Sequence, residues 1–338
     1  KYMIEFNDSD FERAYEEEVD RINEQLEKEI LFAMIGDVNT GKSSTINRLV
    51  GEEVASVGAQ PGETVIVKKY KYKDKIIFAD TPGLDDINSK NSEETEKFFK
   101  EADIILFFLN AAGTVFSDGE KKYFDKISKI NKKIIFVMNK IDAADDIPGL
   151  VKYVQDMTGY NYSVVPISSK TGEHIDRLRN AILDILKKEN KDILFAKSIK
   201  AKSSTANKWI LSAAATATGI GAAPIPGSDI VPLTTIQVGL MLKLATLYEK
   251  SISKDRAKEL ILSSLMGSLG KNIFRQAIKL IPGAGSIVSG SVAGSLTLGL
   301  GYAVKYAYEN NIELDADILK SLSSIFMKEK LVSKGTAI

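Results

Sequence analysis

Short apolar runs recur along the first half of the chain, and each ends in glycine or polar residues. One run stops at Gly36, and others occupy residues 75–79, 133–138 and 162–167. Apolar runs of this length, bounded by turn residues, are typical of buried strands, and the more charged segments between them suit helices. The alternation predicts an α/β domain over residues 30–190, with a mostly parallel, six-stranded sheet flanked by helices.

A different pattern precedes this domain. Between Asp8 and Ile30 apolar residues return every three or four positions within a highly charged segment, which predicts an amphipathic helix in an N-terminal domain of residues 1–29. Either Asp8 or Ser9 would cap it. The helix either packs on its own domain as a solvated helix or braces the C-terminal helices, and we favour the brace. Its apolar stripe consists of Phe11, Tyr15, Val19, Ile22 and Leu26.

The last part of the chain, residues 191–338, is expected to be all-α, apolar and basic. It contains two charge-free runs, at 209–228 and 280–304. The second is long enough to span a bilayer, but its glycines and serines also suit a tightly packed helix in a soluble bundle. Amphipathic helices are expected at 230–250, 254–279 and 316–332.

The stretch IGDVNTGKSS at residues 35–44 places the pattern G-x-x-x-x-G-K-S between a predicted strand and a predicted helix. Backbone N–H groups of such a loop form an anion nest, and the helix dipole adds positive charge. Lys42 would reach the β- and γ-phosphates of a nucleotide, and Ser43 would bind Mg²⁺. The expected nucleotide contacts are Gly36, Asp37, Val38, Asn39, Thr40, Gly41, Lys42, Ser43 and Ser44.

Three further motifs stand at the ends of later apolar runs. D-T-P-G begins at Asp80, which would hold the outer shell of the metal, and the amide of Gly83 would sense the γ-phosphate. N-K-x-D follows at Asn139, Lys140 and Asp142, and the paired acceptors of its carboxylate suit the donor face of guanine. Backbone amides of Ser168, Ser169 and Lys170 could meet the guanine carbonyl.

The composition excludes some classes of chemistry but does not by itself indicate a function. The 338 residues carry no net charge and no cysteine, which excludes disulfide and thiolate chemistry. His174, the only histidine, is expected to be a surface residue rather than a metal ligand. Basic residues outnumber acidic ones after residue 195 and the reverse holds before it, so one end of the molecule is expected to meet an anionic partner or the other domain. No secretory signal peptide is visible in the sequence, and a cytoplasmic location is expected.

These motifs, in this order, make residues 30–188 resemble a Ras-like GTPase domain of the TrmE and Era branch. The resemblance implies GTP or GDP with Mg²⁺ as ligands and hydrolysis of GTP. Leu84 stands where Ras-type enzymes carry a water-orienting glutamine, so another group must hold the water. Glu63, Asp85 and Asp86 are the candidates, and the sequence does not choose among them.

Two assignments depend on this resemblance. Thr64, in a stretch that only loosely matches the first switch of the TrmE branch, is expected to contact Mg²⁺ and the γ-phosphate, next to a hairpin of residues 65–73 and 75–79. Asn39 matches the position that holds a monovalent cation in potassium-activated members, so K⁺-stimulated hydrolysis is one hypothesis. The other is that Asn39 only caps a loop amide. With Lys42 and Gly83, Thr64 completes the expected catalytic set.

The stretch PIPGSDIVPLTTI at residues 224–236 and the glycine-rich helix expected after Ile281, Pro282 and Gly283 make residues 205–310 resemble the C-terminal domain of bacterial YcjF-type proteins. The domain order is similar to that of immunity-related and dynamin-like GTPases. We expect a GTP cycle that controls the helical domain, peripherally or integrally at the cytoplasmic face of a membrane, with a homodimer through the GTPase domains. Lysines at 197, 200, 202 and 208 would meet anionic lipid. The alternatives are a soluble regulatory GTPase with an unidentified protein effector and an Era-like RNA assembly factor. RNA is disfavoured because no G-x-x-G loop in a strand pattern follows.

Overall fold

The computed structural model describes residues 8–37, 39–54, 68–80, 92–221, 230–266, 292–319 and 321–322. The chain forms two compact units, one of Gln25–Ala201 and one of Lys1–Glu24 with Lys202–Ile338. The first is called the α/β unit below and the second the helical unit. The domain limits expected at residues 29 and 190 stay predictions.

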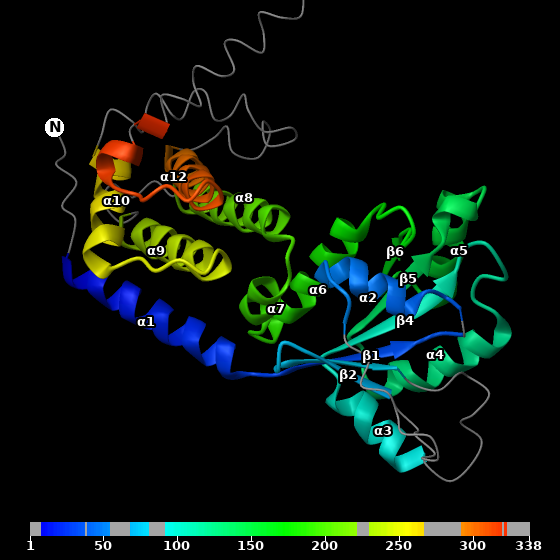
Figure 1. Cartoon of the computed structure of the whole chain (residues 1–338). Coiled ribbons are helices and arrows are strands. Elements are labelled where there is room, and N and C mark those ends of the chain that lie inside the picture. Colours follow the sequence, from blue (N-terminus) through cyan, green and yellow to red (C-terminus); the bar gives the residue numbers. More distant parts are fainter. Residues whose placement is uncertain are drawn as a thin grey trace, which may run out of the picture. The chain divides into compact units, whose positions relative to one another are not determined.

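The α/β unit is built on a six-stranded sheet (Figure 1). Only β2 runs antiparallel, against β3, and the other pairs are parallel. This confirms the predicted mostly parallel sheet. Parallel strands end at the same edge, so the residues that follow β1, β3, β4, β5 and β6 meet there. In spatial order the strands are β2 (Lys68–Tyr72), β3 (Ile76–Asp80), β1 (Ile30–Ile35), β4 (Ile104–Asn110), β5 (Ile134–Asn139) and β6 (Ser163–Pro166).

Helices cover both faces of this sheet, which explains why its central strands are apolar throughout. On one face, α3 (Ser92–Glu101) and α4 (Asp118–Ile130) bury an aromatic core around Phe107 and Phe136. On the other, Phe195 of α7 (Asp192–Ser198) packs 5.5 Å from Phe32 of β1, centroid to centroid. Also in this unit are α2 (Lys42–Val50), η2 (Ile141–Ala143), α5 (Ile147–Thr158) and α6 (Ile175–Lys188).

Local sequence signals set the ends of several helices. Ser117 and Glu120 form a capping box at the start of α4. The side chain of Asp146 caps α5 by accepting from the N–H of Gly149 at 3.0 Å. Helix α2 stops at Gly51, whose φ of 86° is a left-handed C-cap that a residue with a Cβ adopts at a cost.

The helical unit pairs the N-terminal helix with C-terminal helices, as the predicted brace requires. Helix α1 (Asp8–Glu27) buries Phe11 fully, and its Tyr15 hydroxyl donates to the carbonyl of Ile252 at 2.9 Å. Glu16 accepts from Lys254 at 2.8 Å. The helix ends at Glu27 rather than at the predicted Ile30, because Ile30 is already the first, fully buried residue of β1.

Glycines allow the closest helix contacts in this unit. A Cβ on Gly301 would lie 2.9 Å from Ile210, and one on Gly294 would lie 2.9 Å from the carbonyl of Ala214. The small residues of the predicted apolar run therefore serve helix packing where the structure describes them. In the described residues no helix is long and apolar enough to cross a membrane. The C-terminal helices are α8 (Lys202–Gly221), α9 (Ile230–Leu247), α10 (Lys254–Met266) and α12 (Val292–Glu309).

Candidate functional site

The G-x-x-x-x-G-K-S loop joins β1 to α2, as predicted. Gly36 has φ of 148°, and a Cβ there would lie 2.8 Å from the Cβ of Phe108. Gly41 has φ of 88°, and a Cβ there would lie 2.2 Å from Nδ2 of Asn139. Both positions therefore need glycine for space as well as for backbone conformation. Val38 of this loop lies outside the described residues.

Lys42, in the first turn of α2, is held by the loop itself. Its Nζ donates to the carbonyls of Gly36 at 2.7 Å and Asp37 at 3.1 Å. The same nitrogen lies 3.5 Å from Oδ1 of Asp80, the last residue of β3. The ammonium group thus lies between the loop and the acidic strand end, where a phosphate chain would add negative charge.

The two described candidates for Mg²⁺ contact are Ser43 and Asp80. A serine hydroxyl and a carboxylate are hard oxygen donors, which Mg²⁺ prefers, so the residues present fit this ion. The other proposed contacts, Thr64 and Gly83, lie outside the described residues, as do Glu63, Leu84, Asp85 and Asp86. No group of three or more His, Cys, Asp or Glu side chains suited to a metal occurs in the described part of the chain.

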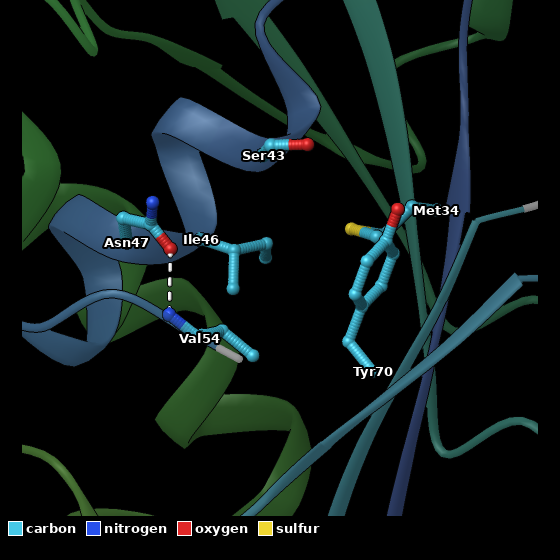
Figure 2. A pocket seen from close by; sticks show the side chains of 6 residues that line it. All are labelled: Met34, Ser43, Ile46, Asn47, Val54 and Tyr70. Atoms are coloured by element: carbon cyan, nitrogen blue, oxygen red, sulfur yellow. Dashed lines mark hydrogen bonds between the residues drawn. The ribbon is translucent and has the colours of Figure 1, made fainter. Parts of the chain in front are cut away.

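A small pocket opens beside Ser43, between α2 and the sheet. Its volume is about 130 Å³. Figure 2 shows Tyr70 of β2 and Met34 of β1 facing the side chains of α2 across it. Asn47 fixes one wall, because its Oδ1 accepts from the N–H of Val54 at 3.0 Å. The lining residues are Met34, Ser43, Ile46, Asn47, Val54 and Tyr70.

Asn139, at the end of β5, joins two of the predicted motifs. Its fully buried side chain donates from Nδ2 to the carbonyl of Thr40 at 2.8 Å and to Oγ of Ser169 at 3.0 Å. Its Oδ1 accepts from the N–H of Ser169 at 2.9 Å. The phosphate loop and the loop after β6 are thereby held to the same amide group.

Asp142 lies in η2, just after Lys140, whose φ of 67° turns the chain out of β5. The hydroxyl of Ser168 donates to Oδ1 of Asp142 at 2.7 Å, and Nζ of Lys170 lies 3.8 Å from Oδ2. The bond from Ser168, with a smaller contribution from nearby lysines, lowers the pKa of the Asp142 carboxyl group. Asp142 is therefore an ionised acceptor at neutral pH.

The remaining predicted residues differ in how strongly the structure fixes them. Thr40 is buried, and its Oγ1 donates to the carbonyl of Asp37 at 2.8 Å. Asn39 and Ser44 are exposed. His174, predicted to be a surface residue, is half-buried, and its Nδ1 lies 3.0 Å from the carbonyl of Pro166.

Sequence patterns missed several residues that position this site. Arg48 of α2 contacts the carbonyls of Ser169 and Lys170. Arg179 of α6 is buried and donates to the carbonyl of Leu49 at 3.2 Å, which holds the end of α2. These contacts join residues more than a hundred positions apart, so no local motif signals them.

Comparisons with known proteins find similar GTPases for the first part of the chain. A family model described as "50S ribosome-binding GTPase" matches residues 31–140. GTPase Era of Aquifex aeolicus is 32% identical over 167 residues, which is 46% of this chain and 56% of Era. GTPase Der of Nautilia profundicola is 34% identical over 193 residues, 54% of this chain and 40% of Der. The chain thus spans about half the length of the curated relatives it matches.

Solved structures give similar partial matches. Era in complex with MgGDPNP and nucleotides 1506–1542 of 16S ribosomal RNA is 28% identical, with a TM-score of 0.37. That match covers 47% of this chain and 57% of that chain. The G domain of the T. maritima FeoB iron transporter is 26% identical, with a TM-score of 0.36, and covers 46% and 98%. The order of its motifs and its mostly parallel sheet give the first part of the chain the fold of a Ras-like P-loop GTPase domain, and its sequence is similar to parts of GTPase Era and GTPase Der.

Proposed function

We propose that the protein binds GTP and GDP with Mg²⁺ and hydrolyses GTP to GDP and phosphate. The observation that carries this proposal is the side chain of Asn139, which holds Thr40 of the phosphate loop and Ser169 of the loop after β6 together. A phosphate cradle and the ionised acceptor Asp142 are thus parts of one hydrogen-bonded assembly. Asp142 can accept two hydrogen bonds from guanine, whereas adenine offers no such donor face.

In this site, catalysis would rest on positioning and charge. Ser43 and Asp80 would hold Mg²⁺, which neutralises charge on the phosphates when it is bound. Lys42 would stabilise the charge that develops on the leaving diphosphate. Because Leu84 cannot orient water, hydrolysis by the isolated protein is expected to be slow.

Turnover in two salts tests both hydrolysis and the role of Asn39. We expect phosphate release from GTP but not from ATP, and faster release in KCl than in NaCl. Asn39 has φ of 66°, so alanine there would strain the backbone, and Asn39→Gly is the better variant. It should lose the advantage of KCl and keep the affinity for GDP. Equal rates in both salts for the wild type would refute the potassium hypothesis, and equal use of GTP and ATP would refute the proposed function.

We further propose that the GTP cycle controls the helical unit. Support comes from where the chain enters the α/β unit. The side chain of Gln25, the first residue of that unit, accepts from the N–H of Ile193 at 3.3 Å. The carbonyl of Leu26 accepts from Lys75, in the turn between β2 and β3, at 2.7 Å. The entry is therefore fixed to the sheet rather than left as a free linker.

The chain is also anchored where it leaves this unit. The N–H of Lys200 donates to the carbonyl of Val50, at the end of α2, at 3.1 Å, and its Nζ lies 3.0 Å from Glu52. The buried hydroxyl of Tyr72 lies 2.7 Å from Oε1 of Glu52 and 2.8 Å from the carbonyl of Ser198. Burial, and then the bond to Glu52, raises the pKa of Tyr72, so the hydroxyl remains a donor at neutral pH. A displacement of α2 would therefore also displace the segment around Lys200, where the chain leaves the α/β unit.

As the target of this control we propose an anionic membrane surface, on the strength of the basic, apolar C-terminal sequence. The lysines first considered for lipid contact are partly engaged within the protein. Lys200 pairs with Glu52, and Lys202 pairs with Glu249 at 2.6 Å. Attraction to lipid would therefore depend on other basic side chains of the helical unit.

Liposome flotation tests this target. With vesicles containing anionic lipid, we expect the full chain to float in the presence of a non-hydrolysable GTP analogue and to float less with GDP. Vesicles of neutral lipid are the control and should not retain it. If the protein stays at the bottom of the gradient in both nucleotide states, the membrane target is wrong. Sedimentation with ribosomes would then test the RNA alternative that the name of the matching family suggests.

A further inference from the structure

The loop Ser168–Gly172 leaves one backbone donor available. Four of its five N–H groups have acceptors. Ser168 donates to the carbonyl of Glu173, Ser169 to Oδ1 of Asn139, Thr171 to Oγ of Ser168, and Gly172 to the carbonyl of Ser168. Among the described residues, no acceptor lies within hydrogen-bonding reach of the N–H of Lys170. The loop therefore presents a single free amide.

Arg48 contacts the peptide group that carries this amide and the peptide group that follows it. Its Nε donates to the carbonyl of Ser169 at 3.1 Å, and its Nη2 donates to the carbonyl of Lys170 at 2.8 Å. The planar guanidinium presents these two donors in a fixed fork. Arg48 lies on α2, the same helix that carries Lys42 and Ser43.

The orientation of the free amide follows from peptide geometry. In a trans peptide the C=O and the N–H point in opposite directions. The carbonyl of Ser169 points to Arg48, so the N–H of Lys170, which belongs to the same peptide group, points away from Arg48. The loop also carries Ser168, which holds the carboxylate of Asp142.

We propose that Arg48 is a positioning residue for guanine recognition: it holds the Ser169–Lys170 peptide so that the N–H of Lys170 donates to the 6-carbonyl of the base. The inference rests on the proposed binding of guanine nucleotides. It assigns the two edges of the base to different groups. Asp142 reads the N1–H and the 2-amino group, while the Arg48-supported amide reads the 6-carbonyl.

A role limited to stability predicts something different. Arg48 is exposed, and hydrogen bonds of exposed side chains add little to the free energy of unfolding. If Arg48 only tied α2 to the loop, its removal would loosen the whole site and lower the affinity for every nucleotide alike. If Arg48 positions one donor, its removal should lower the affinity only for nucleotides whose base carries the 6-carbonyl.

Three diphosphates separate these cases: GDP, inosine diphosphate, which lacks the 2-amino group, and 2-aminopurine riboside diphosphate, which lacks the 6-carbonyl and with it the N1–H. Each variant is compared with the wild type for the same nucleotide, so the lower affinity that the missing N1–H causes cancels. Affinities can be measured by competition against a fluorescent GDP with the full chain and Mg²⁺. Arg48→Ala should lower the affinities for GDP and inosine diphosphate by a similar factor, about tenfold, which corresponds to the loss of one hydrogen bond. The affinity for the 2-aminopurine analogue should not change.

Two variants complete the experiment. Arg48→Lys keeps the charge but cannot form the fork, so it should show an intermediate loss with the same base dependence. Arg177, exposed on α6, is the matched control, and Arg177→Ala should bind all three nucleotides like the wild type. Thermal melting shows whether each variant folds.

Equal weakening of all three nucleotides, or no weakening by either Arg48 substitution, would overturn the inference. A wild-type protein that does not bind GDP would instead overturn the proposed function itself.

Discussion

Replacing Lys42 by alanine should lower the affinity for GDP and GTP about a hundredfold. The ammonium of Lys42 lies within 3.1 Å of two carbonyls of the phosphate loop and 3.5 Å from Oδ1 of Asp80. Charge-assisted hydrogen bonds are worth about 1.5–3 kcal/mol each, and a loss of about 2.7 kcal/mol corresponds to a factor of one hundred. Isothermal titration calorimetry with Mg²⁺ present measures the change directly.

Lys152 provides a matched control for this substitution. It is exposed on α5 within the same unit, and Lys152→Ala should bind nucleotide like the wild type. Because Lys42 also bonds to Gly36 and Asp37, its removal should lower the melting temperature of the free protein slightly. Unchanged GDP affinity in a folded Lys42→Ala variant would mean that this loop does not bind the phosphates.

Local sequence was enough to predict the edge of the sheet at which the site lies. Asp80 and Asn139 are the last residues of β3 and β5, and the phosphate loop follows β1 directly. Such residues can be placed from sequence because the end of an apolar run marks the end of a buried strand, and the ends of parallel strands share one edge.

The supports behind these residues could not be predicted in the same way. Arg48 contacts Ser169, and Tyr72 contacts Ser198, across more than a hundred residues in each case. Each looks like an ordinary surface or strand residue in its local sequence, and only the tertiary structure gives it an acceptor. The orientation of a surface arginine depends on which loop packs opposite its helix.

The N-terminal helix shows a related limit. Its spacing predicted an amphipathic helix, but an apolar stripe specifies no particular partner. In the structure, Phe11 and Tyr15 belong to the helical unit, while Gln25 and Leu26, on the same helix, belong to the α/β unit. Residues of one continuous helix are thus assigned to both units.

Asp142→Asn should change the preferred nucleotide from GTP to xanthosine triphosphate. The hydroxyl of Ser168 receives the N–H of Thr171 and donates its own proton to Oδ1 of Asp142. In the variant, the amide oxygen should take this position, which leaves the amide nitrogen at the Oδ2 side. An NH₂ group there opposes the donors of guanine and suits the 2-carbonyl of xanthine. We expect GTP affinity to fall about a hundredfold and xanthosine triphosphate affinity to rise by a similar factor.

The neighbouring carboxylate provides the control for this exchange. Asp145 is exposed three residues beyond Asp142, and Asp145→Asn removes the same charge without altering the base contacts. Competition between the two nucleotides for each variant separates recognition of the base from general electrostatics, because a general effect of charge would change both variants alike. Since the pKa of Asp142 is lowered, the preference of the wild type for GTP should persist down to the usual carboxyl range near pH 4. An Asp142→Asn variant that still prefers GTP would place the guanine contact elsewhere.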